Sequence, residues 1–289
     1  MKWINRNDDT SNYEDRRGMS RGKKAAVGGG LGTIIVLALY LFTGQDFSPV
    51  VDMFSGGGGG TQTMQMDPSR ANENEDLKVF SLGVFNSAND VWTEVFRQQL
   101  GRQYRKPTFV TFTDFTTSAC GGASEQVGPF YCPGDEKVYI DLNFFHKLAS
   151  QFRAPGELAM AYVTAHEVGH HVQRLLGLTD QMQQYRGRIP ERQYNDLSVR
   201  LELQADFYAG LWVHHAVKMG TIQLEEGDIE SALGAANAVG DDTIQKQAQG
   251  YVIPDSFTHG TAEQRMRWFM LGYRTGDFSK GDTFSVTNL

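Results

Sequence analysis

The stretch that decides the fold is Leu158-Ala159-Met160-Ala161-Tyr162-Val163-Thr164-Ala165-His166-Glu167-Val168-Gly169-His170-His171-Val172. Uncharged helix formers lead into a polar HExxH motif, so the stretch predicts a buried helix with one chemically active face. Two imidazoles four residues apart share a helix face and can hold one metal ion, which makes His166 and His170 candidate metal ligands. Glu167 stands between them and is the candidate general base. The alternative is a surface helix with unrelated histidines.

Zinc is the metal that this donor set favours, and a catalytic zinc has three protein ligands plus a water whose pKa falls to about 7. The longer HExxHxxGxxH motif is excluded, because Gln173 and Leu176 occupy its glycine and histidine positions. A long helix is predicted over residues 196–217, where Glu202 and Asp206 lie one turn apart. We predict Glu202 as the third ligand and Asp206 as the group that accepts a hydrogen bond from a ligand histidine. The alternative is a solvated pair of acids.

A later segment offers a second catalytic candidate. His259 precedes a predicted helix, and we expect it to reach back to the site and stabilise an oxyanion. Arg265 would then orient His259 or the substrate, whereas the alternative for both is a helix-capping or surface role. His171 lies about 100° round the helix from His170, so it should not touch the metal.

The N-terminal part predicts a membrane anchor. Residues 25–43 are uncharged and long enough to cross a bilayer once as a helix. Five basic residues lie close before this run, at positions 16–24, and none follows until Arg70, which predicts a cytoplasmic N-terminus and a periplasmic or extracellular domain; they are Arg16, Arg17, Arg21, Lys23 and Lys24. A cleavable signal peptide is the alternative. Gly28 and Gly32 form a small-xxx-small pattern that permits a homodimer through the span.

The 289 residues divide into four predicted parts. Residues 1–24 form a polar cytoplasmic tail, 25–43 the transmembrane anchor, 44–75 a Gly-rich linker, and 76–289 the folded domain. Within the domain we predict a helix over 77–100, a strand over 108–112, and a hairpin that joins 130–131 to 138–140, followed by helices. The fold class is therefore α+β and mainly helical. The hairpin edge could pair with an extended peptide, or be purely structural.

Cys120 and Cys132 are the two cysteines of the chain, and their even number in an exported domain predicts a disulfide. Closing that loop would contribute about 3 kcal/mol in the loop-entropy model. The chain has 27 basic and 34 acidic residues, and seven of the basic ones lie in the first 24 residues. The domain is therefore acidic and shows no basic stripe, which argues against nucleic-acid binding.

The chain resembles the bacterial neutral zinc metallopeptidases. The resemblance rests on the charged leader with its single span, on the Gly-rich linker and on four motifs. The motifs are Gly128-Pro129-Phe130-Tyr131-Cys132-Pro133, Val138-Tyr139-Ile140-Asp141, His166-Glu167-Val168-Gly169-His170-His171-Val172-Gln173 and Glu202-Leu203-Gln204-Ala205-Asp206-Phe207-Tyr208-Ala209-Gly210. More broadly, HExxH followed by Glu-x-x-x-Asp is similar to the glutamate-zincin peptidases. That likeness implies a zincin-like fold, Glu202 as zinc ligand and Asp206 as its supporting residue. The segment from His259 to Arg265 is similar to a later His-and-Arg element of membrane-associated members, with Gly260 where those members usually have proline.

These observations lead to one expected function. The chain should be a membrane-anchored zinc peptidase that hydrolyses peptides or proteins, with Glu167 activating the water. Two alternatives stay open: a membrane-anchored scaffold protein with a structural zinc, and a zinc hydrolase of non-peptide amides such as a cell-wall crosslink. A closed structural site would need a fourth protein ligand, and no cysteine lies near enough in sequence to supply one.

Overall fold

A computed structural model describes residues 1–20, 65–66, 74–124 and 127–289. The predicted anchor at 25–43, its Gly28 and Gly32 pattern and most of the linker lie outside these ranges. Within the described ranges, the model contains no helix that combines the length and the apolar character needed to cross a membrane.

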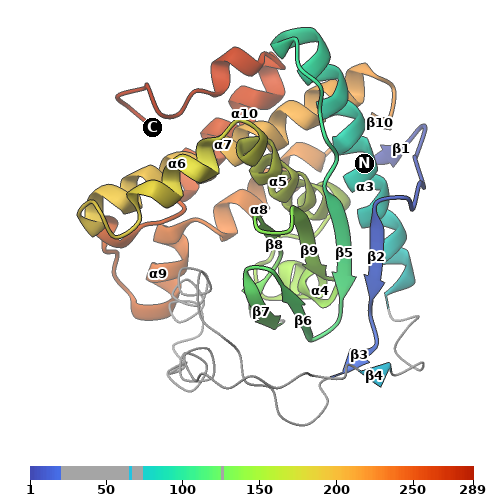
Figure 1. Ribbon diagram of the computed structural model, residues 1–289, viewed down its shortest axis with the longest axis horizontal. Helices are drawn as coiled ribbons and strands as arrows, with labels where there is room; N and C mark the ends of the chain where they lie inside the picture. The colour runs from blue at the N-terminus through green and yellow to red at the C-terminus, as the bar shows by residue number, and fades with distance from the viewer. Residues whose placement is uncertain (21–64, 67–73, 125–126) are drawn as a thin grey trace.

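A four-stranded sheet forms one side of the molecule, with the strand order β2-β5-β9-β8 (Figure 1). The strands are β2 (Tyr13–Arg16), β5 (Thr108–Phe112), β9 (Lys137–Asp141) and β8 (Phe130–Cys132). The first three run parallel, and β8 pairs antiparallel with β9 at the edge. The predicted strand over 108–112 and the predicted hairpin are therefore confirmed.

The N-terminal residues differ from the expected separate tail. Strand β1 (Lys2–Trp3) pairs with β10 (Ile222–Gln223), β2 pairs with β5, and β3 (Met19–Ser20) pairs with β4 (Gln65–Met66). The folded domain thus includes residues 1–20 and does not begin near Asp76. Sequence reading missed β2 because the strand reads Tyr-Glu-Asp-Arg, a charged pattern suited to a sheet edge rather than an apolar alternation.

Helices supply most of the remaining structure. They are α3 (Glu75–Val95), α4 (Asn143–Ser150), α5 (Glu157–Leu175), α6 (Leu178–Tyr185), α7 (Glu191–Lys218), α8 (Asp228–Ala238), α9 (Asp241–Gln249) and α10 (Ala262–Thr275), with a π-helical turn at Phe96–Leu100 and 3₁₀ turns at Pro254–Ser256 and Phe278–Gly281. The helices predicted over 77–100 and 196–217 are confirmed. Helix α5 packs against α3, α7 and α8, so it runs through the centre of the core.

Helices α7 and α10 approach each other almost backbone to backbone. A Cβ atom on Gly210 of α7 would lie 1.9 Å from the carbonyl oxygen of Phe269, and one on Gly272 of α10 would lie 2.0 Å from that of Phe207. Both contacts are far below any tolerated separation, so glycine is required at each position. The close crossing brings α10 near the part of α7 that carries the predicted metal ligand.

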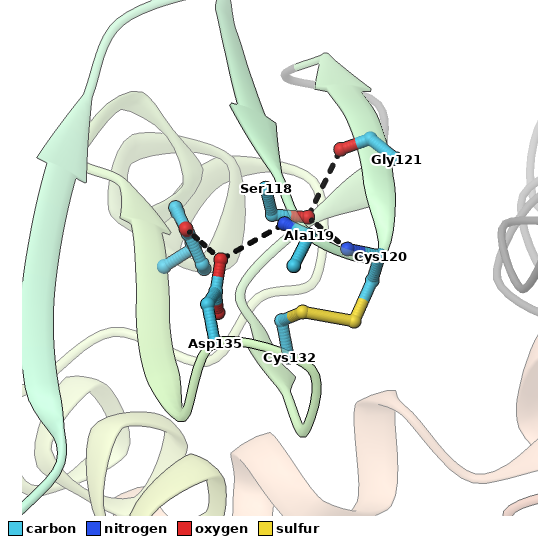
Figure 2. Close-up of a disulfide and its surroundings, with 7 residues drawn as sticks. Ser118, Ala119, Cys120, Gly121, Cys132 and Asp135 are labelled. Atoms are coloured by element: carbon cyan, nitrogen blue, oxygen red, sulfur yellow. Dashed lines mark hydrogen bonds between the residues drawn. A yellow bond between two sulfur atoms is a disulfide. The ribbon is translucent and has the colours of Figure 1, made fainter. Parts of the chain in front are cut away.

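The predicted disulfide between Cys120 and Cys132 is present (Figure 2). It ties the end of β8 to the turn of a hairpin that was not predicted, formed by β6 (Phe115–Ser118) and β7 (Gly121–Ser124). The Asp135 carboxylate accepts a hydrogen bond of 2.9 Å from the backbone N–H of Ala119 in the same turn. The disulfide and this bond together fasten the β6–β7 hairpin to the β8–β9 hairpin.

Candidate metal centre

Helix α5 carries the two histidines of the HExxH motif. Its apolar residues enter the core, and His166 itself is only 6 % exposed. The imidazole rings of His166 and His170 lie 4.8 Å apart between centroids and are nearly perpendicular, with an interplanar angle of 89°. The spacing of four residues therefore places both rings on one face of a buried helix, as predicted.

Helix α7 brings Glu202 to the same point. Its Oε2 lies 3.2 Å from Nε2 of His166, and its Oε1 lies 3.6 Å from Nε2 of His170. One candidate ligand atom from each of the three residues lies within 4.8 Å of the other two. The helices approach closely at Gly169, where a Cβ atom would be 3.3 Å from the Cα and carbonyl oxygen of Ala205. The structure thus brings together the three residues predicted as ligands.

Asp206 lies behind His166, fully buried. Its Oδ1 accepts a hydrogen bond of 2.9 Å from Nδ1 of His166 and one of 2.5 Å from the Tyr162 hydroxyl. Arg265 of α10 donates to both carboxylate oxygens, from Nε to Oδ2 at 2.9 Å and from a terminal nitrogen to Oδ1 at 3.0 Å. Asp206 therefore fixes the His166 ring with Nε2 directed at Glu202, which agrees with its predicted supporting position.

Gln173 holds the second histidine and was not predicted. Its Oε1 lies 2.9 Å from Nδ1 of His170, while its amide nitrogen donates to the carbonyl of Leu201 at 2.7 Å. Because the amide nitrogen is engaged there, the oxygen must face His170. This places a proton on Nδ1 of His170 and leaves Nε2 as the ring atom that can bind a metal. Gln173 stands three residues after His170 on the same helix face, and that spacing was the available signal.

The charge of the site favours a bound cation. Burial disfavours the charged imidazole of His166, but the carboxylates of Asp206 and Glu202 outweigh burial and raise its pKa to about 10. The pKa of Glu202 is held well below its usual range, since the two imidazoles overcome the opposing effect of burial. Positive charge stabilises these buried carboxylates. A divalent ion that displaces the imidazole protons would supply that charge.

Glu167 lies next to the ligands, 8 % exposed. Burial raises the pKa of its carboxyl group, although the neighbouring imidazoles and the backbone N–H of Tyr131 in β8 act in the opposite direction. A carboxylate with a raised pKa is a better proton acceptor near neutral pH than an ordinary glutamate. The contact with Tyr131 also joins the active face of α5 to the edge strand of the sheet.

His259 is held by a residue that sequence reading missed. Asp241, at the start of α9, accepts hydrogen bonds through Oδ2 from the backbone N–H groups of Thr258, His259 and Gly260 at 2.7, 2.7 and 3.0 Å. Its Oδ1 lies 3.2 Å from Nδ1 of His259. Burial opposes the charged ring, but Asp241 and then Glu202 raise the pKa of His259. The electrostatic interaction with Glu202 is consistent with the predicted approach of His259 to the site.

Gly260 shows why proline is absent from this position. Its φ of +91° is one that proline cannot adopt, and its N–H donates to Asp241, a bond that proline lacks. The expected partners of Arg265 need correction. Arg265 is 4 % exposed and binds Asp206, Tyr162 and the carbonyl of Val239, rather than His259. It therefore acts on the metal centre through Asp206.

His171 points away from the ligands, as predicted. Its Nδ1 lies 2.9 Å from the Tyr131 hydroxyl and its Nε2 lies 2.7 Å from the carbonyl of Arg105. Burial lowers the pKa of His171 to about 4, so the ring is neutral and donates from Nε2 to that carbonyl. This histidine ties α5 to β8 and to the chain before β5.

Comparison with known proteins identifies the family of this chain. A family model described as "putative neutral zinc metallopeptidase" matches residues 1–284. The chain belongs to this family. It is 40% identical to protein YpfJ of Escherichia coli (strain K12) over 98% of this chain and 99% of that protein. It is 43% identical to protein Rv2575 of Mycobacterium tuberculosis (strain ATCC 25618 / H37Rv) over 76% of this chain and 74% of that protein. No solved structure matches it.

Proposed function

We propose that this protein is a zinc-dependent peptidase whose metal ligands are His166, His170 and Glu202. The observation that carries the proposal is the convergence of these three ligand atoms within 4.8 Å beside the buried Glu167. Two imidazole nitrogens and one carboxylate form a donor set of catalytic zinc sites, which keep a position for water or substrate. Among the described residues no fourth candidate ligand joins the group, which argues against a closed structural site.

Zinc, when bound, would polarise a peptide carbonyl and lower the pKa of water in the site to about 7. Glu167 would accept a proton from the attacking water as the new carbon–oxygen bond forms. Its protonated carboxyl group would then deliver that proton to the amine nitrogen as the carbon–nitrogen bond breaks. His259 would donate a hydrogen bond from Nε2 to the oxyanion, since Asp241 engages Nδ1 at the other side of the ring.

An extended peptide is the substrate shape that the sheet favours. Strand β8 pairs only with β9 among the described strands, so no other described strand covers its second edge, where an extended peptide could pair. Tyr131 lies in this strand and contacts Glu167 through its backbone N–H. A peptide that added to β8 would therefore bring a backbone carbonyl close to the catalytic carboxylate.

The proposed location of the domain is the periplasm or the cell exterior. The disulfide between Cys120 and Cys132 supports this location, because disulfides persist in oxidising compartments. The uncharged run at 25–43 is the candidate for membrane association on sequence grounds.

The test uses the full chain, because residues 1–20 belong to the folded unit. Wild type, Glu167→Gln and the exposed control Glu263→Gln on α10 are assayed for bound zinc by elemental mass spectrometry and for cleavage of a peptide library. We expect all three to bind zinc, and cleavage to be lost in Glu167→Gln and after chelation. Bound zinc with no cleavage and no binding of hydroxamates would favour a structural zinc. Cleavage by Glu167→Gln at the wild-type rate would exclude the mechanism.

A further inference from the structure

Helix α3 binds the N-terminal segment through two positions, Asn86 and Gly83. Asn86 on α3 is buried, and its amide nitrogen donates to the backbone carbonyls of Asn7 at 2.8 Å and Asp9 at 2.9 Å. One turn earlier, a Cβ atom on Gly83 would lie 2.8 Å from the Arg6 side chain and 3.2 Å from the Trp3 ring. Helix α3 thus has a glycine where the N-terminal segment crosses it and a buried amide that binds that segment's backbone.

Strand β2 completes the sheet on the same side. Four residues of β2 pair in parallel with β5, and the Tyr13 hydroxyl lies 2.6 Å from the hydroxyl of Thr111. Arg17 is 3 % exposed and pairs with Asp15 and, at 2.9 Å, with Glu75 at the start of α3. A buried arginine with two carboxylate partners is an integral part of a fold, since removing it from these partners would leave charges unpaired.

Strand β3, which ends at Ser20, and strand β4, which begins at Gln65, lie side by side. Met19 and Ser20 of β3 pair antiparallel with Met66 and Gln65 of β4. The two ends of the intervening segment are therefore adjacent on one molecule. Strand β1 adds a separate attachment, because it pairs with β10 beyond α7 (Figure 1).

We infer that residues 1–20 lie in the same compartment as the candidate metal centre. A single membrane crossing by residues 25–43 would put them on opposite sides, so it cannot occur while residues 1–20 are docked. The apolar layer of a bilayer is about 30 Å thick, and one crossing would separate by that distance groups that here form hydrogen bonds. The disulfide places this shared compartment among the oxidising ones. Arg16 and Arg17 are two of the basic residues that predicted a cytoplasmic N-terminus, but both contact the domain: Arg16 donates to the carbonyl of Thr117 at 2.8 Å, and Arg17 pairs with Glu75 at 2.9 Å. The inference does not rest on the proposed peptidase activity.

A crosslink between β1 and β10 tests this inference in cells. Lys2 and Gln223 are register partners with exposed side chains, so Lys2→Cys with Gln223→Cys can form a disulfide only when β1 is docked. A protease site inserted after Gly60 allows the chain to be cut into an N-terminal and a C-terminal half. The native disulfide cannot join these halves, because both of its cysteines lie in the C-terminal half. The matched control combines Lys2→Cys with Gln184→Cys, an exposed position on α6 far from β1 (Figure 1). The single variants are also labelled with a membrane-impermeant maleimide before and after permeabilisation.

We expect the halves of the first double variant to stay joined without reductant and those of the control to separate. The single variants Lys2→Cys and Gln184→Cys should become labelled under the same condition, because both positions lie on one side of the membrane. The inference would be overturned if Lys2→Cys and Gln184→Cys became labelled from opposite sides of the membrane and the halves of both double variants separated. The first result would place both the N-terminus and the metal centre on one side.

Discussion

At the scale of single residues, the candidate metal centre depends on residues that hydrogen-bond to the proposed ligands. Asp206 both orients His166 and neutralises Arg265, and all three side chains are buried. Tyr162 joins them through its hydroxyl, one helical turn before His166. Such supporting groups raise ligand basicity and fix the tautomer, so their loss weakens metal binding without removing a ligand.

For Asp206→Asn we therefore expect zinc affinity to fall about 10–100-fold. The amide accepts fewer charged hydrogen bonds than the carboxylate, and Arg265 loses its counter-charge. Competition with a zinc chelator measures the affinity. Asp196→Asn is the matched control, because Asp196 lies on the same helix but is exposed and binds only Arg200 in the described contacts. Equal affinity of Asp206→Asn and wild type would show that Asp206 does not support the metal.

Asp241→Asn should impair His259 rather than the metal. Without the carboxylate, the ring loses the partner that orients it and raises its pKa. We expect kcat to fall about 10²-fold, as for removal of an oxyanion donor, with KM and bound zinc little changed. Steady-state kinetics on a cleaved peptide separate kcat from KM. His259→Ala combined with Asp241→Asn should be no slower than His259→Ala alone, and additive losses would contradict the dependence of one residue on the other.

At the scale of elements, three helices position the chemistry. Helix α5 presents the imidazoles, α7 presents the carboxylates, and α10 delivers Arg265 to Asp206. A capping box starts α10, with the Thr261 hydroxyl accepting from the N–H of Gln264 and the Gln264 side chain accepting from the N–H of Thr261. The crossing of α7 and α10 at Gly210 and Gly272 leaves no space for a side chain. The position of Arg265 therefore depends on two glycines that are not among the candidate metal ligands.

Gly210→Ala should lower the free energy of unfolding by about 1–3 kcal/mol, because the added methyl group meets the carbonyl of Phe269 and forces the helices apart. Urea unfolding measures this change. Gly234→Ala on α8 is the matched control. Its Cβ atom would meet nothing within 4 Å, so helix propensity should stabilise the protein by about 0.5–1 kcal/mol. A Gly210→Ala protein as stable as wild type would mean that the two helices can move apart freely.

At the scale of the whole molecule, one core joins the sheet, the central helix and both ends of the described chain. The C-terminal turn after α10 contacts α7, and Gln204 of α7 donates to the carbonyl of Gly281 at 2.9 Å. His215, near the end of α7, is 7 % exposed, and its Nε2 lies 2.8 Å from the carbonyl of Gly276. Burial lowers the pKa of His215, so the folded protein binds a proton at this ring less readily than the unfolded chain does.

This lowered pKa predicts a loss of stability in mild acid. The unfolded chain binds a proton at His215 near pH 6.5, whereas the folded protein binds it only at lower pH. The contribution is therefore fully present above about pH 6.5 and decreases as the pH falls towards the folded-state pKa. The free energy of unfolding, measured with urea at pH 7.5 and pH 5, should fall less between these two pH values for His215→Gln than for wild type. His146→Gln, at an exposed position, is the control, and equal losses in all three proteins would contradict the prediction.

The sequence by itself determined the parts of this protein that rest on local spacing. The periodicity over 158–172 and 196–217 determined two helices, the HExxH spacing placed two imidazoles on one face, and alternation determined β5 and the β8–β9 hairpin. Two cysteines sufficed to predict the disulfide. Each of these features depends on neighbours along the chain, whose geometry the backbone repeats fix.

Only the tertiary structure decided which distant residues meet. Arg265 and Asp206 lie 59 positions apart and Asp241 and His259 lie 18 apart, and no spacing rule connects either pair. The charged strand β2 resembles a soluble tail until β5 supplies partners for its backbone and Glu75 of α3 pairs with Arg17, the residue that follows it. Such contacts depend on how elements pack, because a polar side chain or edge strand shows its role only when its partner is in place.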